Sequence, residues 1–122
     1  MSFLFGPKVD EADVRETADG LATEPGAVLI DVREPHEWRA GHARGARHIP
    51  LAQLPGSLDQ LPREAPVYLI CATGNRSRNA AAFLQKNGFR RPVNVRGGTA
   101  AWQRAGLPIE RGPPRALRSR AP

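Results

Sequence analysis

The apolar residues of the chain fall into short runs that alternate with amphipathic segments. Residues 27–30 and 67–70 are continuous apolar runs, with the length and character of strands buried on both faces. Shorter extended segments are expected at residues 47–49 and, after Pro92, at residues 93–95. Strands that alternate with helices along a chain predict an α/β protein with a parallel sheet.

Helix signals stand between the expected strands. Asp10 is in the position of an N-cap, Asp13 would then lie near the positive end of the helix, and Gly20 can end it. Leucines recur at helical spacing across residues 51–61, but Pro55 interrupts them. We therefore expect a regular helix that starts after Asp10 and ends at Gly20, and a broken helix over residues 51–61.

Three further helices are expected from residue pattern and end signals. Pro35 is placed for the first turn of a short helix that Gly41 can terminate. Residues 76–87 have one apolar face, and Gly88 is placed for a Schellman-type cap after the helix. A final short helix is expected at residues 99–104.

Length and composition fit one globular domain. The chain has 122 residues, 40% of them hydrophobic, and no run approaches the roughly 20 apolar residues of a membrane span. The single Cys excludes an internal disulfide and any zinc site that needs several cysteines of one chain. A lone thiol suits a reducing compartment, so we expect a cytoplasmic protein that makes no membrane contact.

Charge is unevenly divided along the chain. The net charge is +6, but residues 1–64 hold 7 basic against 11 acidic residues, whereas residues 65–122 hold 11 against 1. A basic half can attract an anionic substrate, a nucleic acid or an acidic protein. A compositional bias explains the charge equally well, because 16 of the 18 basic residues are Arg. No nucleic-acid-binding motif accompanies the charge, so no nucleic-acid partner is expected.

The main chemical signal is Cys71, which follows the apolar run 67–70. Sites in parallel sheets form beyond the carboxyl ends of strands, where helix N-termini favour negative charge. Gly74 can adopt a positive φ, which lets successive N–H groups point inward as an anion nest. These dipoles and the Arg76 cation would lower the pKa of the thiol. An inert buried thiol is the usual state of a lone Cys, but this context favours a nucleophile.

Four segments of the chain resemble the rhodanese domain family and occur in that family's order. They are C-A-T-G-N-R-S (Cys71 to Ser77), Leu29 to Trp38, Gly41 to Pro50, and Asn94 to Trp102. The resemblance implies a rhodanese-like three-layer α/β sandwich over residues 1–109, in which helices flank a central, mainly parallel sheet. Residues 110–122 are expected to form a basic, flexible C-terminal tail.

The same resemblance implies which residues form the site. Cys71 would carry the sulfur, and the backbone of the next residues would cradle the persulfide; these are Ala72, Thr73, Gly74, Asn75, Arg76 and Ser77. Arg76 matches a basic residue often found at the end of that loop. The family commonly has a larger or basic residue directly after the Cys, whereas this chain has Ala72, so donor specificity does not transfer.

Loop length separates two chemistries of this architecture. Related phosphatases have a Cys-x5-Arg loop, whereas Cys71 and Arg76 are spaced as Cys-x4-Arg. The resemblance therefore favours sulfane sulfur over phosphoryl groups, with the size of the anion nest as the physical rationale. We expect a sulfurtransferase that moves sulfur from thiosulfate, a small anionic donor, or from a persulfide. The sulfur would pass through Cys71 to a thiol acceptor or cyanide, without a metal or organic cofactor.

Two other classes of function stay open beside the enzyme. A protein of the same fold could relay sulfur without turnover, or it could dock through its basic face on an acidic protein partner. A phosphatase or arsenate reductase is the third alternative, and the loop length disfavours it.

Several other polar residues are expected to have structural roles. Asp31 and Arg33, at the end of an expected strand, are predicted to form an ion pair that braces two loops. His36, His42 and His48 are six residues apart, which matches no usual spacing of metal ligands. His42 and His48 are instead expected to hydrogen-bond a turn.

Two glycines and two tryptophans complete the set of candidate residues. Gly97 and Gly98 lack the full pattern of a phosphate-binding loop and predict a tight turn before the last helix. Trp38 and Trp102 each fall in a short amphipathic segment, which is typical of core residues rather than of a ligand-stacking site.

Overall fold

The computed structural model describes residues 8–112, which form a parallel sheet covered by helices on both faces. The strands are β1 (Asp10–Ala12), β2 (Val28–Asp31), β3 (His42–Ala43), β4 (Arg47–His48), β5 (Val67–Ile70), β6 (Pro92–Val95) and β7 (Ile109–Glu110). The helices are α1 (Val14–Thr23), α2 (Pro35–Ala40), the 3₁₀ helix η2 (Leu51–Gln60), α3 (Asn75–Lys86) and α4 (Gly98–Arg104).

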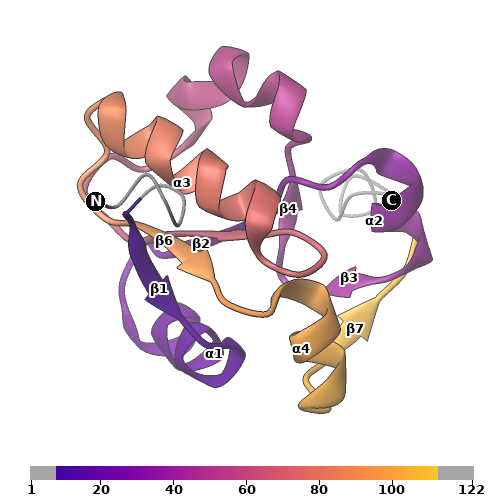
Figure 1. Ribbon diagram of the computed structural model, residues 1–122. Helices are drawn as coiled ribbons and strands as arrows, with labels where there is room; N and C mark the ends of the chain where they lie inside the picture. Colours follow the sequence, from indigo (N-terminus) through magenta and orange to yellow (C-terminus); the bar gives the residue numbers. More distant parts are fainter. Residues whose placement is uncertain (1–7, 113–122) are drawn as a thin grey trace, which may run out of the picture.

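The central sheet has five parallel strands in the order β1-β6-β5-β2-β4. In Figure 1, α3 and η2 lie on one side of this sheet, whereas α1 and α4 lie on the other. This arrangement confirms the expected three-layer α/β fold. The small antiparallel pair of β3 and β7 lies apart from the sheet and was not predicted.

The side chains of β5 alternate between two cores, as expected for a strand buried on both faces. Val67 and Leu69 pack with residues of α3 and η2, whereas Tyr68 and Ile70 pack with residues of α1, α2 and α4. All four residues of β5 are buried. The loop that follows β5 is therefore anchored at the centre of the sheet.

The start of the first helix differs from the prediction. Asp10 belongs to β1, where it pairs with Val93, and the N-cap is Asp13. The Asp13 carboxylate accepts a hydrogen bond from the Glu16 amide, and the Glu16 carboxylate accepts one from the Asp13 amide, each at 2.8 Å. This capping box stabilises a later start. The prediction was wrong because the residues before Asp13 form β1, which pairs with the distant strand β6.

The same helix also extends past Gly20, which was expected to end it. Gly20 is buried inside α1, and a Cβ atom at this position would overlap the hydroxyl of Tyr68. The glycine is therefore required for close packing of the helix on the sheet rather than for termination.

The remaining elements agree with the sequence within one or two residues. Gly88 has a φ of 87°, its amide donates to the Gln85 carbonyl, and the Phe89 amide donates to Leu84. These contacts form the expected Schellman cap. The segment with Pro55 is an exception: it was expected to be a broken helix, but it forms one continuous 3₁₀ helix, η2, which contains Pro55 without an interruption.

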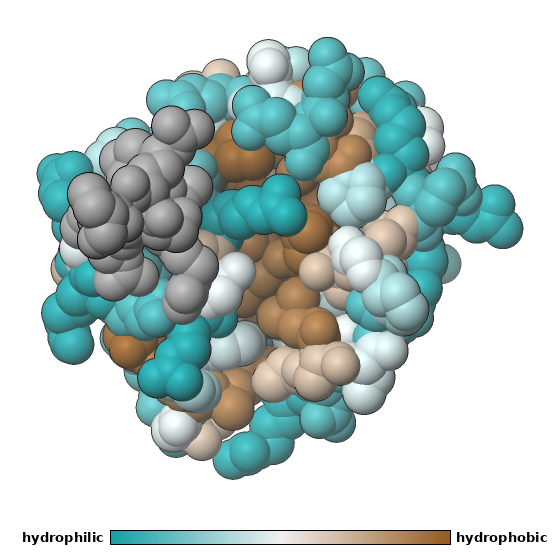
Figure 2. All heavy atoms as spheres, turned by 180° about the vertical axis from the view of Figure 1, so that it is seen from behind, coloured by the Kyte–Doolittle hydropathy of each residue, from teal (hydrophilic) through white to brown (hydrophobic). Residues whose placement is uncertain are grey.

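The face opposite to that of Figure 1 has apolar side chains in its middle and hydrophilic ones around them (Figure 2). Among the described residues, no helix is both long and apolar enough to cross a bilayer. The domain boundary at residue 109 stays a prediction: Glu110 belongs to β7, and the part of the expected tail after residue 112 lies outside the described residues.

Candidate active site

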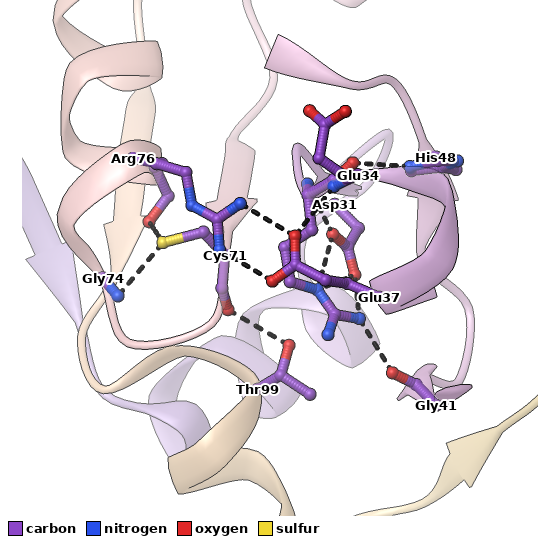
Figure 3. A network of polar contacts seen from close by, with 11 residues as sticks. Asp31, Glu34, Glu37, Gly41, His48, Cys71, Gly74, Arg76 and Thr99 are labelled. Atoms are coloured by element: carbon purple, nitrogen blue, oxygen red, sulfur yellow. Dashed lines mark hydrogen bonds and ion pairs between the residues drawn. The ribbon is translucent and has the colours of Figure 1, made fainter. Parts of the chain in front are cut away.

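Cys71 directly follows β5, and its sulfur lies inside the turn that leads into α3 (Figure 3). The Gly74 amide donates to Cys71 Sγ at 3.1 Å, and the Ser77 hydroxyl lies 3.2 Å from the same atom. Gly74 has a φ of 114° and is the N-cap residue of α3. Its left-handed conformation turns its N–H inward, as expected for an anion nest.

These donors favour the ionised form of the cysteine. Burial raises the pKa of Cys71, but hydrogen bonds from the Ser77 hydroxyl and from the amides of Ser77, Gly74 and Thr73 lower it, and the net shift is downward. A thiolate is the nucleophilic form of cysteine. The loop therefore supplies the electrostatic setting that a reactive thiol needs.

The sulfur is nevertheless well enclosed. Cys71 is 1% exposed, so the candidate nucleophile has almost no contact with solvent. A cavity of about 380 Å³ lies beside it and is lined by Arg33, His36, Glu37, Ala40, Gly41, Ala72, Thr73, Thr99, Ala100 and Gln103. The loop residues Ala72 and Thr73 border this cavity, whereas Cys71 does not. In this structure the loop therefore separates the sulfur from the cavity.

The start of α4 holds the carbonyl side of the loop. The Cys71 carbonyl accepts hydrogen bonds from the Thr99 amide at 2.8 Å and the Thr99 hydroxyl at 3.1 Å. The Ala72 carbonyl accepts from the Ala100 amide at 3.1 Å. A Cβ atom on Gly98, whose φ is 60°, would lie 2.5 Å from both carbonyl oxygens. The predicted tight turn is confirmed, and its glycine also lets α4 approach the loop.

Arg76 was expected to act on the thiol, but its guanidinium is bound to Glu37 of α2. Two hydrogen bonds of 2.8 and 2.9 Å join the two side chains. The Arg76 hydrogen bonds lower the pKa of Glu37 to about 2, and Glu37 raises the pKa of Arg76. The Arg76 charge is therefore balanced by a carboxylate that the sequence analysis did not assign to the site.

Asn94 is a second residue that the sequence analysis missed. It lies in β6 with no exposed surface, and the Ser77 hydroxyl lies 2.6 Å from its Oδ1 atom. A signal was present, because Asn is depleted in strands and here it stands between two valines. A buried polar residue in such a strand needs a hydrogen-bond partner.

The loop residues predicted to form the cradle differ in their surroundings. Ala72 and Thr73 border the cavity, Asn75 is the exposed first residue of α3, and Ser77 is buried. Of the six predicted cradle residues, Gly74 through its amide and Ser77 through its hydroxyl donate hydrogen bonds to the sulfur, and the Thr73 amide also contributes to the lowered pKa of Cys71.

The expected brace is present beside the site. Arg33 makes three side-chain hydrogen bonds of 2.8 to 3.1 Å to the buried Asp31 carboxylate and donates to the Gly41 carbonyl at 2.8 Å. His42 Nδ1 donates to the Trp38 carbonyl, and His48 Nε2 donates to the Arg33 carbonyl, both at 2.7 Å. Each nitrogen must carry the hydrogen, because a carbonyl only accepts.

Aromatic stacking completes the brace. Both imidazoles stack on Trp38, and Trp38 and Trp102 are 1% and 3% exposed, which confirms that they are core residues. Within residues 8–112, no cluster of three or more His, Cys, Asp or Glu side chains could hold a metal ion.

The fold and the site together define an α/β protein with a cysteine held by loop amides at the end of its central strand. The chain matches the family model for the Rhodanese-like domain over residues 13–105. It is 36% identical over 101 residues to a sulfurtransferase of Allochromatium vinosum, covering 83% of this chain and 94% of that protein. The chain therefore belongs to the rhodanese family, as its motifs indicated.

Two further comparisons agree with this membership. The chain is 40% identical over 90 residues to a thiosulfate sulfurtransferase, GlpE, of Actinobacillus pleuropneumoniae, with 74% of this chain and 83% of that protein covered. The crystal structure of a rhodanese-related protein from Thermoplasma volcanium superposes with a TM-score of 0.74 at 30% identity, covering 83% and 97% of the two chains. These relatives support sulfurtransferase activity in general.

Proposed function

We propose that the protein transfers sulfane sulfur from thiosulfate or a persulfide to a thiol or cyanide through a persulfide on Cys71. The observation that carries this proposal is the set of neutral donors around Sγ, which lowers the pKa of the thiol although it is buried. Such donors stabilise a negative sulfur without neutralising it by a bound cation. The names of the relatives agree with this chemistry.

In the first step, the Cys71 thiolate attacks the outer sulfur of thiosulfate. A new sulfur–sulfur bond forms at Sγ, the original sulfur–sulfur bond breaks, and its electron pair leaves with sulfite. The charge of the thiolate leaves with sulfite, and the outer sulfur keeps the negative charge that it carried in thiosulfate. Loop N–H groups that face Sγ can stabilise the thiolate before the attack and the persulfide after it.

In the second step, an acceptor thiolate or cyanide attacks the outer sulfur of the persulfide. The bond to Sγ breaks, and its electron pair restores the Cys71 thiolate, which the same donors stabilise as a leaving group. The cavity beside the loop offers an approach for the acceptor. The loop separates the sulfur from this cavity, so it must open for the acceptor to reach the persulfide.

The test is the intact mass of the protein after incubation with thiosulfate. The native protein is expected to gain one sulfur atom, which cyanide or a thiol then removes. Cys71→Ser is expected to gain none, and Ser57→Ala, which removes a hydroxyl of the helix η2 that donates to the Gln53 carbonyl, is the control expected to load like the native protein. Equal loading of the Cys71→Ser protein would contradict the proposal.

Turnover separates the enzyme from a relay. Repeated release of thiocyanate from thiosulfate and cyanide is the result expected for a sulfurtransferase. A stable adduct without turnover would instead indicate a relay protein, and hydrolysis of an aryl phosphate that needs Cys71 would indicate a phosphatase.

A further inference from the structure

A line of buried polar contacts leads from Cys71 across the sheet to β1. The Ser77 hydroxyl oxygen lies 3.2 Å from Cys71 Sγ and 2.6 Å from Asn94 Oδ1. The Asn94 Nδ2 atom donates to a Glu11 carboxylate oxygen at 2.8 Å. Ser77 and Asn94 have no exposed surface, and the Glu11 side chain is 25% exposed. Neither Asn94 nor Glu11 belongs to the loop that forms the cradle.

Glu11 determines which way the Asn94 amide points. A carboxylate only accepts hydrogen bonds, so the NH₂ group of Asn94 must face Glu11, and the carbonyl oxygen must face Ser77. Arg78 pairs with Glu11 at 2.7 Å, and Arg96 lies 3.8 Å from it. The hydrogen bonds from Arg78 and Asn94 lower the pKa of Glu11, so it stays an acceptor at neutral pH.

The Ser77 hydroxyl has one hydrogen but two acceptors within reach. When Cys71 is a thiol, its S–H can donate to Ser77, and the Ser77 hydrogen can go to Asn94. When Cys71 is a thiolate, the sulfur needs that hydrogen, and Asn94 must give it up. The fixed carbonyl of Asn94 is therefore a competitor of the thiolate for the same donor.

We propose that Asn94 is a positioning residue that competes with Cys71 for the Ser77 hydroxyl, and that Glu11 holds the Asn94 amide in the orientation that makes it a competitor. Without this contact, the Ser77 hydrogen would serve the sulfur alone. The thiolate would then be more stable and less nucleophilic, because nucleophilicity falls with the pKa of the thiol. Only this consequence for sulfur transfer rests on the proposed function.

The other charged groups near Cys71 are paired among themselves. Arg76 of α3 is bound to Glu37 of α2, and Asp31 and Arg33 at the end of β2 are bound to each other. Near Asn94, the charged groups are Glu11, Arg78 and Arg96. Substitutions at Asn94 and Ser77 change none of these charges, which makes them suitable tests of the contact itself.

The experiment measures the pKa of Cys71 from the pH dependence of its alkylation by iodoacetamide. Cys71 is the single cysteine of the chain, so intact mass reports its reaction alone. Asn94→Leu, which keeps a similar size but removes the acceptor, is expected to lower the midpoint by about one pH unit. Ser77→Ala, which removes the donor, is expected to raise it by a similar amount.

The combination of both substitutions tests the competition directly. In the Ser77→Ala background, Asn94→Leu is expected to have no effect on the midpoint, because no hydroxyl is left to share. A midpoint that is unchanged or raised by Asn94→Leu alone would overturn the proposal. A full effect that persists without Ser77 would also overturn it. Urea unfolding checks that each variant is folded.

Glu11 offers a second test at a partly exposed position. Glu11→Ala frees the Asn94 amide to turn, so the midpoint is expected to fall in the native background and to stay unchanged in the Asn94→Leu background. Glu24→Ala removes another Arg-paired carboxylate and is the control expected to have no effect. An equal shift in both backgrounds would show that Glu11 acts through its charge and would overturn its assigned role. Failure of thiosulfate loading would refute the proposed function but leave these midpoints interpretable.

Discussion

The carboxyl ends of β2 and β5 lie side by side, and each carries a buried group that can be negatively charged. Asp31 at the end of β2 is bound by the Arg33 guanidinium and by the Arg33 amide at 2.9 Å. Cys71, after β5, is instead surrounded by loop amides and the Ser77 hydroxyl. One negative group therefore has a cation as partner, whereas the other has neutral dipoles.

The kind of partner decides what each group can do. In a buried ion pair each charge compensates the other, and removing either one leaves an unpaired charge in the interior. Neutral donors tolerate both states of the sulfur and leave it free to bond to a second sulfur atom. Equivalent places at the edge of one sheet thus provide a brace in one case and a candidate reactive centre in the other.

Removal of the cation from the brace should give the largest effect. Arg33→Ala leaves the fully buried Asp31 carboxylate without its partner, and we expect it to lower the free energy of unfolding by about 3–5 kcal/mol. Arg76→Ala breaks a partly exposed pair and should cost about 1 kcal/mol or less. Urea unfolding measures both. If both variants lost the same free energy of unfolding, the Asp31–Arg33 pair would be no more important for stability than the Arg76–Glu37 pair.

A methyl group at Gly98 tests whether the candidate reactive centre depends on its backbone. Gly98→Ala adds roughly 1–2 kcal/mol of left-handed strain, and its clash with the Cys71 and Ala72 carbonyls adds a further ~1–3 kcal/mol. We also expect the pKa of Cys71 to rise, because the loop amides move away from the sulfur. Urea unfolding and the pH dependence of alkylation measure the two effects.

Gly45→Ala is the matched control for that experiment. Gly45 also has a positive φ, of 87°, but no atom lies within 4 Å of the added methyl group. It should show the strain alone and leave the pKa of Cys71 unchanged. If Gly98→Ala behaves in the same way as Gly45→Ala, the contact between α4 and the loop does not shape the cradle.

Features that depend on neighbouring residues could be predicted from the sequence. The position of Cys71 after an apolar strand, the positive φ of Gly74 and the cap at Gly88 each have a local signal. The brace at Asp31 and Arg33 spans two residues and was likewise predicted. Local backbone preferences and short spacings carry this information.

Features that depend on distant pairing could not be predicted in the same way. Asp10 shows a cap-like pattern, but its pairing with β6 moves the helix start to Asp13. Arg76 and Glu37 are 39 residues apart, and Asn94 and Glu11 are 83 apart. No periodicity in one segment indicates such a partner. The sequence therefore predicted the loop that holds the sulfur but not the residues that hold Arg76 and Ser77.

The smallest expected effect is the contribution of the Glu37–Arg76 pair to the pH dependence of stability. Its size can be compared with the contribution of the buried Asp31–Arg33 pair. The pKa of Glu37 is about 2 in the folded protein and 4.5 ordinarily, so the unfolded chain binds its proton first as pH falls. Its stabilising contribution is complete above pH 4.5 and is lost as pH falls towards 2. Because the Arg76 side chain is 39% exposed, we expect this contribution to be about 1 kcal/mol or less.

Urea unfolding across this pH range measures the contribution. As pH falls, the free energy of unfolding should decrease less for Glu37→Gln and for Arg76→Gln than for the native protein. Parallel curves for all three proteins would mean that solvent screens the pair completely, leaving the buried Asp31–Arg33 pair as the brace that matters for stability.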